Sequence, residues 1–284
     1  MKSEQNSTHA RIGMVHYINT APIHEIWKER SLQDNWILVE EHPAALNQML
    51  SRGEIDLGFV SSHEYGVRPD DYRILADLSI SANGPVGSVF LFSRIKAEKL
   101  AGLPVLLSSE SKTSVCLTRI ILESFFNVKP RYIAGAVREA RFKGAEAVLA
   151  IGDDAIRLKV EGSYQYCLDL GEVWQLETGL PFVFAVCAVR EDFYMRHPQT
   201  VGHIHRELID CRDEGIRQLQ RICEIAAPRI PMEITACHSY LKAIEYDLDE
   251  AKMLALERFF SYLKTFGEAS AHVLPLKILN LNKE

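Results

Sequence analysis

The chain has 284 residues, of which 47% are hydrophobic and 25% are charged. This length and composition predict a globular protein with one large domain or two medium ones, and they exclude a disordered chain, a fibre or a repeat array. The formal net charge of −6 argues against a nucleic-acid-binding protein, because the phosphate backbone favours a basic surface. An anionic ligand would have to be held by local groups, since the overall charge does not attract it.

The sequence indicates a protein of the cytoplasm rather than of a membrane. Residues 1–10 are polar and lack the apolar core of a signal peptide, and no apolar run is long enough to span a bilayer. The six cysteines are scattered along the chain and form no CxxC pair. We therefore expect them to be buried as small apolar side chains, and we expect no metal site.

The first third of the chain alternates between predicted strands and helices. The expected elements are a strand over 11–18, a short helix starting near Pro22, a strand over 36–41, a helix over 42–52 that Gly53 ends, and a strand over 55–60. This alternation predicts a parallel sheet covered by helices.

The middle of the chain repeats this pattern, and the last third is helical. The expected elements are strands over 86–93, 104–107, 145–151 and 182–189, and a helix over 113–126. From about residue 199 helices dominate, and the last of them is amphipathic and covers 247–266.

Two long apolar strands, at roughly 86–94 and 182–190, flank one α/β block. If both strands cross between lobes, residues 1–90 and 190–284 form the first lobe, and residues 91–189 form an inserted second lobe. The sequence thus predicts a two-lobed α/β fold, with a ligand cleft between the lobes and the two crossovers as a hinge.

Polar segments follow five of the predicted strands, at the end where open parallel sheets bind their ligands. These segments are rich in hydroxyl groups and poor in Lys and Arg, so they suit a carboxylate held by neutral donors and by the free N–H groups of helix starts. The candidate binding residues are Asn19, Ser61, Ser62, Ser81, Asn83, Gly87, Ser88, Ser111, Thr113, Ser114, Gly152 and Asp153. Each serine could instead be a plain helix cap, and the spacing alone predicts only a two-lobed binder of small anions.

Two other patterns are weak candidates for metal sites. His203 and His205 are separated by one residue and therefore lie on different sides of a helix. Asp153-Asp154 fits the capped start of a helix better than a cation site. The sequence contains no Walker loop and no GxGxxG, GxSxG or HExxH motif.

Several stretches of the chain together resemble one known family. They include Arg11-Ile12-Gly13, Tyr17-Ile18-Asn19 with Pro22, Gly53-Glu54-Ile55-Asp56-Leu57 leading to Ser61-Ser62 and Glu64-Tyr65, Gly84-Pro85-Val86-Gly87-Ser88, Ser111 with Thr113-Ser114, Ile151-Gly152-Asp153-Asp154, and Thr178-Gly179-Leu180-Pro181-Phe182. This set is similar to the menaquinone-biosynthesis family of chorismate dehydratases, in order from about residue 11 to residue 190.

The resemblance implies a periplasmic-binding-protein type II fold. It also implies a hydro-lyase that converts chorismate, a dicarboxylate, into 3-[(1-carboxyvinyl)oxy]benzoate in the futalosine route to menaquinone, without a cofactor. A sister family with the same fold makes 1,4-dihydroxy-6-naphthoate, but the opening Tyr17-Ile18-Asn19 with Pro22 resembles the dehydratases. The rival from another class is a non-catalytic cytoplasmic anion-binding protein of the same fold. We expect a monomer or a homodimer with no nucleic-acid or membrane partner.

The implied reaction removes the hydrogen at C3 and the hydroxyl at C4 of the chorismate ring. Donors such as the Thr113-Ser114 pair or the Ser61-Ser62 pair would hold the C1 carboxylate, on which negative charge develops.

Three groups could act as the base at C3. They are His16, Glu64, and the enolpyruvyl carboxylate of the substrate itself, oriented by Asn19. We favour the substrate carboxylate because bases are scarce in the polar segments. The family more often has a small polar residue where this chain has His16, so the role of His16 stays open.

Overall fold

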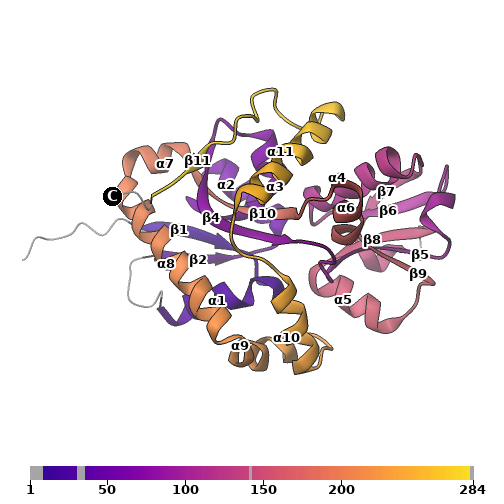
Figure 1. Cartoon of the computed structure of the whole chain (residues 1–284), viewed down its shortest axis with the longest axis horizontal. Helices are drawn as coiled ribbons and strands as arrows, with labels where there is room; N and C mark the ends of the chain where they lie inside the picture. Colours follow the sequence, from indigo (N-terminus) through magenta and orange to yellow (C-terminus); the bar gives the residue numbers. More distant parts are fainter. Residues whose placement is uncertain (1–8, 31–35, 141–142, 282–284) are drawn as a thin grey trace, which may run out of the picture.

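The computed structural model describes residues 9–30, 36–140 and 143–281, so the polar segment 1–8 lies outside the described part of the chain. The described residues form two β-sheets, each with its own helices, and the two sheets lie side by side along the long axis of the molecule (Figure 1). The predicted two-lobed α/β architecture is therefore confirmed.

The first sheet has six strands in the order β11-β4-β10-β3-β1-β2. Their bounds are Ala10–Met14 (β1), Trp36–Glu40 (β2), Leu57–Ser61 (β3), Tyr72–Ala82 (β4), Phe182–Arg190 (β10) and Ile278–Leu279 (β11). Strand β1 is parallel to both β2 and β3, which confirms the parallel sheet predicted for the first third of the chain. β1 and β3 approach closely at Gly58, whose φ is +154°. A Cβ at this position would lie 2.1 Å from the main-chain oxygen of Gly13, so only glycine permits this approach.

The second sheet has five strands in the order β7-β6-β8-β5-β9, all from the middle of the chain. Their bounds are Val89–Ser93 (β5), Pro104–Ser108 (β6), Arg131–Gly135 (β7), Ala147–Ile151 (β8) and Tyr166–Asp169 (β9). β6 is parallel to β7 and β8, whereas β5 is antiparallel to β8 and β9. Every residue of β5 and β8 is buried, as expected for strands covered on both faces.

The chain passes from the first sheet to the second between β4 and β5, and it returns in β10. β4 and β10 are antiparallel neighbours in the first sheet, with Ala82 opposite Phe182. The sequence places the lobe boundaries at residues 90 and 190. Residue 90 lies inside β5, and residue 190 is the last residue of β10. Because β5 pairs only in the second sheet and β10 only in the first, we propose to draw the boundaries at residues 83–88 and 179–181.

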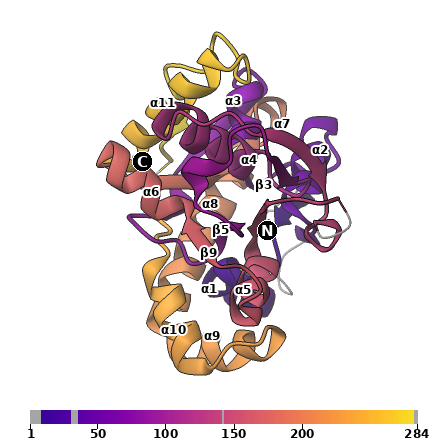
Figure 2. The same cartoon turned by 90° about the vertical axis from the view of Figure 1, so that its right-hand side faces the viewer.

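Helices cover both sheets. They are Ala21–Arg30 (α1), Pro43–Arg52 (α2), Ser62–Val67 (α3), Lys112–Arg119 (α4), Gly152–Glu161 (α5), Leu170–Thr178 (α6), Glu191–Arg196 (α7), Pro198–Arg217 (α8), Leu219–Ala226 (α9), Ile234–Ala243 (α10) and Glu250–Thr265 (α11). Gly53, at φ +73°, ends α2 as predicted. The helix predicted over 113–126 is α4, which continues as a π-helix over Ile120–Phe125. Figure 2 shows α9 and α10 at one end of the molecule and α11 at the other.

Strand β4 corrects the prediction for Ser81. The sequence analysis takes Ser81 as a binding residue in a polar segment, whereas Ser81 lies inside β4, which continues to Ala82. The hydroxyl of Ser81 donates to the main-chain oxygen of Glu245 at 3.1 Å, and Ser79 donates to the main-chain oxygen of Asp247. Both serines therefore satisfy a neighbouring segment inside the fold.

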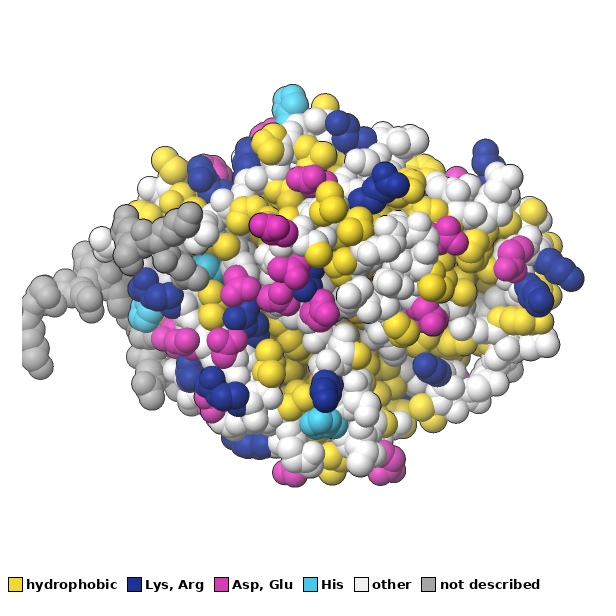
Figure 3. Space-filling view, viewed as in Figure 1, with side chains coloured by type: hydrophobic (Ala, Val, Ile, Leu, Met, Phe, Trp, Pro, Cys, Tyr) yellow, Lys and Arg dark blue, Asp and Glu magenta, His cyan; other side chains and the backbone are white. Residues whose placement is uncertain are grey.

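Acidic and basic side chains are interspersed on the face of the molecule shown in Figure 3.

Two predictions about the helices can be compared with the structure. His205 is buried and His203 is exposed, so the two lie on different sides of α8, as predicted. None of the helices in the described ranges is long and apolar enough to cross a membrane.

Two glycines of α8 offer a test of the packing. Helix α8 packs against α1, and a Cβ on Gly215 would lie 1.9 Å from the main-chain oxygen of Pro22. We expect Gly215→Ala to lower the free energy of unfolding by about 1–3 kcal/mol, because the two helices must separate. Urea denaturation measures this change. Gly202→Ala on the same helix is the control, since its Cβ would meet nothing within 4 Å; it should raise the stability by up to about 1 kcal/mol. Equal effects of the two variants would contradict close packing at Gly215.

Candidate active site

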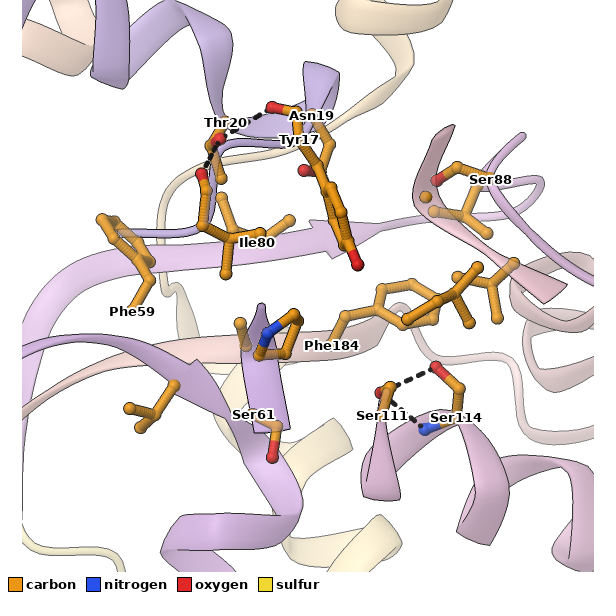
Figure 4. Close-up of a pocket in the computed structure, with 18 residues that line it drawn as sticks. Tyr17, Asn19, Thr20, Phe59, Ser61, Ile80, Ser88, Ser111, Ser114 and Phe184 are labelled. Carbon is orange, nitrogen blue, oxygen red and sulfur yellow. Dashed lines mark hydrogen bonds between the residues drawn. The ribbon is translucent and has the colours of Figure 1, made fainter. Parts of the chain in front are cut away.

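A pocket with an empty volume of about 640 Å³ lies between the two sheets. Both sheets contribute to its lining, as do the segments that follow β1, β6 and β8. Apolar side chains such as Phe59, Ile80 and Phe184 form much of the wall. Figure 4 shows Tyr17 and Asn19 on one side of the pocket, with Phe184 and the serines of α4 facing them. The lining, with apolar walls and a few polar groups, is typical of a small-molecule site.

Three helices begin at the pocket. Ser61 is the N-cap of α3, Ser111 is the N-cap of α4, and Gly152 is the first residue of α5. All three residues line the pocket. Because the N-terminal end of a helix carries partial positive charge, this arrangement favours an anionic ligand without any Lys or Arg.

The hydroxyl of Ser61 is oriented as a donor. Its oxygen accepts hydrogen bonds from the side-chain N–H of Asn47 at 2.8 Å and from the main-chain N–H of Glu64 at 3.4 Å. Asn47 also accepts from the main-chain N–H of Ser61 at 3.1 Å, so its amide holds Ser61 at both ends. A hydroxyl has two acceptor lone pairs and one hydrogen. With both lone pairs used by the protein, the hydrogen of Ser61 is the part left for a ligand.

The other pocket serines follow the same principle. Ser88 accepts from the phenol of Tyr240 at 2.9 Å. Ser111 accepts from the main-chain N–H of Ser114 at 3.3 Å, and the two hydroxyls share a bond of 3.1 Å. Each arrangement leaves at least one hydroxyl hydrogen without a protein acceptor. The pocket therefore presents several neutral O–H donors, which is the pattern expected for a bound carboxylate.

Asn19 lies directly beyond β1, in a short 3-10 helix over Ile18–Thr20. Its main-chain oxygen accepts from the phenol of Tyr246 at 2.9 Å, which fixes the backbone. Its side-chain Oδ1 is buried and has no hydrogen-bond partner. A buried amide oxygen without a donor is unfavourable by about 1–3 kcal/mol, so this atom is suited to accept a hydrogen bond from a ligand.

Tyr17 is a pocket residue that the sequence analysis did not select. Its phenol lies 3.2 Å from Glu110 Oε2 and 3.2 Å from His42 Nδ1, and its ring packs against Gly152. Burial, together with the charge of Glu110, raises the pKa of Tyr17 far above its usual value, so it stays a neutral phenol. The signal in the sequence was its place at the same strand end as Asn19. Phe184 was missed because its apolar strand showed no polar tip.

Six of the candidate binding residues line the pocket, and the others do not. Asn19, Ser61, Ser88, Ser111, Ser114 and Gly152 belong to the lining. Ser62 lies outside it, since its hydroxyl donates to the main-chain oxygen of Val183 at 2.7 Å. Thr113 uses its oxygen to accept from the main-chain N–H of His63 at 2.9 Å. The binding roles of the lining residues stay predictions.

Of the remaining candidates, Gly87 and Asp153 hold the surroundings of the pocket together. The main-chain N–H of Gly87 donates to Asp169 at 2.7 Å, and Asn83 is exposed. Asp153 accepts from the main-chain N–H of Ile18 at 3.4 Å, which ties α5 to the segment that carries Asn19. Burial raises the pKa of Asp153.

Neither predicted protein base lines the pocket. His16 is half-exposed, stacks on His24 at 4.5 Å, and accepts from Arg229 at 2.7 Å. Burial and the neighbouring cations lower the pKa of His16. Glu64 accepts from the phenol of Tyr72 at 3.0 Å, and burial raises its pKa. Among the described residues that line the pocket there is no Asp, Glu, His, Lys or Arg.

The solved structures that resemble this chain define its class. Protein AF1704 from Archaeoglobus fulgidus superposes with a TM-score of 0.74 at 17% identity, covering 92% of this chain and 99% of that protein. The alkanesulfonate-binding protein SsuA from Xanthomonas axonopodis pv. citri gives a TM-score of 0.71 at 16% identity, covering 96% and 98%. With two lobes and a pocket between them, the chain has the type II fold of periplasmic binding proteins.

The family follows from the sequence comparisons. The model of the menaquinone biosynthesis family matches residues 10–265, and the chain belongs to that family. A chorismate dehydratase from Thermus thermophilus is 30% identical over 263 residues, which cover 87% of this chain and 93% of the relative. A chorismate dehydratase from Campylobacter jejuni subsp. jejuni is 28% identical over 177 residues, which cover 61% and 64%.

Proposed function

We propose that this chain is a chorismate dehydratase, a hydro-lyase that converts chorismate into 3-[(1-carboxyvinyl)oxy]benzoate and water. Two relatives carry the name of this activity, and the family to which the chain belongs serves menaquinone biosynthesis. The observation that carries the proposal is the pocket itself, which combines O–H donors and helix starts with an unpartnered amide oxygen, and whose described lining residues include no Asp, Glu, His, Lys or Arg. Chorismate has two carboxylates and one hydroxyl, so it matches these groups.

The carboxylate at C1 of the ring is the group best suited to the pocket serines. Charge-assisted hydrogen bonds contribute about 1.5–3 kcal/mol each, so three donors could bind a carboxylate without a salt bridge. Ser111 and Ser114 stand at the start of α4, and Ser61 stands at the start of α3. As the C3 proton leaves, negative charge spreads through the ring alkene to this carboxylate. The same donors then stabilise the transition state more than the ground state.

The elimination needs a base at C3 and a leaving group at C4. The electron pair of the C3–H bond forms the new C3–C4 double bond, the hydroxide leaves C4, and the removed proton joins it to give water. The product ring is aromatic, which supplies the driving force. We assign the base to the enolpyruvyl carboxylate of the substrate, since the described lining offers no carboxylate or imidazole. Asn19 would donate to that carboxylate and accept from the C4 hydroxyl through Oδ1.

We also place this reaction in the futalosine route to menaquinone and in the cytoplasm. The family match supports menaquinone biosynthesis.

The activity is tested by incubating the purified protein with chorismate. We expect conversion to an aromatic product without added metal or cofactor. Ultraviolet absorbance measures the conversion, and mass spectrometry should identify the product as chorismate minus one water. Chorismate that binds but is recovered unchanged would make the chain a binding protein. The sister synthase acts on another compound, so a naphthoate enzyme would also leave chorismate unchanged.

Asn19 is the residue on which turnover should depend most. We expect Asn19→Leu to lower kcat by about 10²-fold or more, the scale of one lost transition-state donor. The thermal melting point should change little, because the side-chain oxygen of Asn19 bonds to no other part of the described protein. Asn19→Asp keeps the shape but places a negative charge beside a dianion, so it should weaken substrate binding as well. A normal kcat together with a lowered melting point in Asn19→Leu would show a purely structural residue.

The choice of base is tested at His16. If the substrate carboxylate is the base, His16→Gln should keep kcat within about twofold, and kcat should stay flat between about pH 6 and pH 8, because carboxylic acids titrate near pH 4. If His16 were the base, the substitution would lower kcat by about 10²–10⁴-fold. The parent enzyme would also lose activity as the pH falls through the pKa of His16, which burial and the neighbouring cations lower from its ordinary value. The effect of His16→Gln on kcat, measured by steady-state kinetics, separates the two mechanisms.

A further inference from the structure

Three potential metal ligands meet beside the pocket although they lie far apart in the sequence. They are His63 in α3, Cys116 in α4 and Glu268, which follows α11. One ligand atom from each residue lies within 4.8 Å of the other two. His63 and Glu268 belong to the part of the chain that builds the first sheet, and Cys116 belongs to the part that builds the second.

His63 has an imidazole nitrogen that the protein leaves without a hydrogen bond. The residue is 8% exposed, and its Nε2 is buried and has no hydrogen-bond partner. The nearest carboxylate oxygen is Oε2 of Glu268, at 3.7 Å. This distance is too long for a hydrogen bond, but two ligands of one metal ion are commonly separated by such a distance, since each lies about 2.0–2.2 Å from the ion.

Glu268 is held in the orientation that such a site requires. Arg119 donates to its Oε1 at 2.8 Å, which leaves Oε2 directed towards His63. Arg119 itself is fixed by Glu123 at 3.3 Å. Metal-binding carboxylates are commonly held by a second hydrogen-bonding partner of this kind.

The identity of the ligand atoms selects the metal. One nitrogen, one sulfur and one oxygen form a set typical of zinc, whereas magnesium and calcium prefer oxygen alone. We propose that His63, Cys116 and Glu268 bind one zinc ion, with water in the fourth position. Burial raises the pKa of the Cys116 thiol to about 12, so zinc binding must release that proton. The proposal stands independently of the proposed catalytic activity.

A second group of potential ligands does not form a comparable site. His16, His24 and Glu25 also lie close together. However, both ring nitrogens of His24 face carboxylates, and Arg229 donates to both His16 and Glu25. The nitrogen and oxygen atoms that a metal would need are therefore already paired, whereas Nε2 of His63 makes no hydrogen bond and has the Glu268 carboxylate 3.7 Å away.

A zinc ion at the proposed site would join α3 to α4 directly behind the pocket. His63 follows Ser61 by two residues, and Cys116 follows Ser114 by two residues. Both serines line the pocket, and the two helices pack against each other. Because the helices belong to different sheets, the metal would bridge the lobes and fix the distance between their serines.

The test titrates the metal-stripped protein with Co²⁺ and then with Zn²⁺. A cobalt ion bound to a thiolate in a four-coordinate site gives a charge-transfer band in the near ultraviolet and intense visible bands. We expect one equivalent of Co²⁺ to produce these bands and Zn²⁺ to remove them. Cys116→Ala should abolish the charge-transfer band. His63→Gln and Glu268→Gln should each weaken Co²⁺ binding by at least about tenfold, because removing a group that only hydrogen-bonds to a metal ligand typically costs about 10–100-fold in metal affinity.

Cys167→Ala is the matched control, because Cys167 is an exposed cysteine outside the cluster. It should bind Co²⁺ as the parent does. The proposal is wrong if the parent shows no thiolate band, if the band survives in Cys116→Ala, or if it disappears in Cys167→Ala. Glu268 is partly exposed, so Glu268→Gln should fold normally by circular dichroism. Unchanged affinity in that variant would overturn the three-ligand site even if Cys116→Ala were misfolded.

Discussion

The buried carboxylate of Asp169 holds together the point where the chain passes between the sheets. Its Oδ1 accepts from the main-chain N–H groups of Val86, Gly171 and Glu172 at 3.0–3.2 Å, and its Oδ2 accepts from Gly87 at 2.7 Å. One side chain thus caps α6 and fixes the outgoing crossover. Ser88 is the last residue of this crossover and follows Gly87 directly, so the position of a pocket donor depends on it. A buried charge is tolerated here because four donors surround it.

Much of the fold could be predicted because many helices and strands are marked by short sequence patterns. The buried strands β3 and β8 stand out as apolar runs, and Gly53 marks the end of α2 because only glycine adopts its left-handed conformation readily. The length of β4 could not be predicted, since its serines are satisfied by residues 245–247, more than 160 positions away. The partly exposed edge strands β7 and β9 lack a continuous apolar run, so they gave no clear signal.

In the candidate site, too, the local sequence does not predict contacts between distant parts of the chain, and here the contacts are those of single side chains. The strand ends correctly indicate where polar groups gather, and Asn19, Ser61 and Ser88 line the pocket. Which neighbour points inward depends on tertiary contacts: Ser62 turns to a carbonyl of β10, although it directly follows Ser61. The proposed zinc ligands lie beyond any reasoning from spacing, because three separate segments supply them.

The pairing of Ala82 with Phe182 has a consequence for how the chain is divided. Facing residues of an antiparallel pair lie only about 5 Å apart, so residues 83–181 leave the first sheet and rejoin it at nearly the same place. The middle of the chain is therefore a loop in the topological sense, closed at its base. A short linker could replace it without stretching the first sheet, and the excised segment would have adjacent ends. Such a segment meets the geometric requirement for transfer between proteins by insertion.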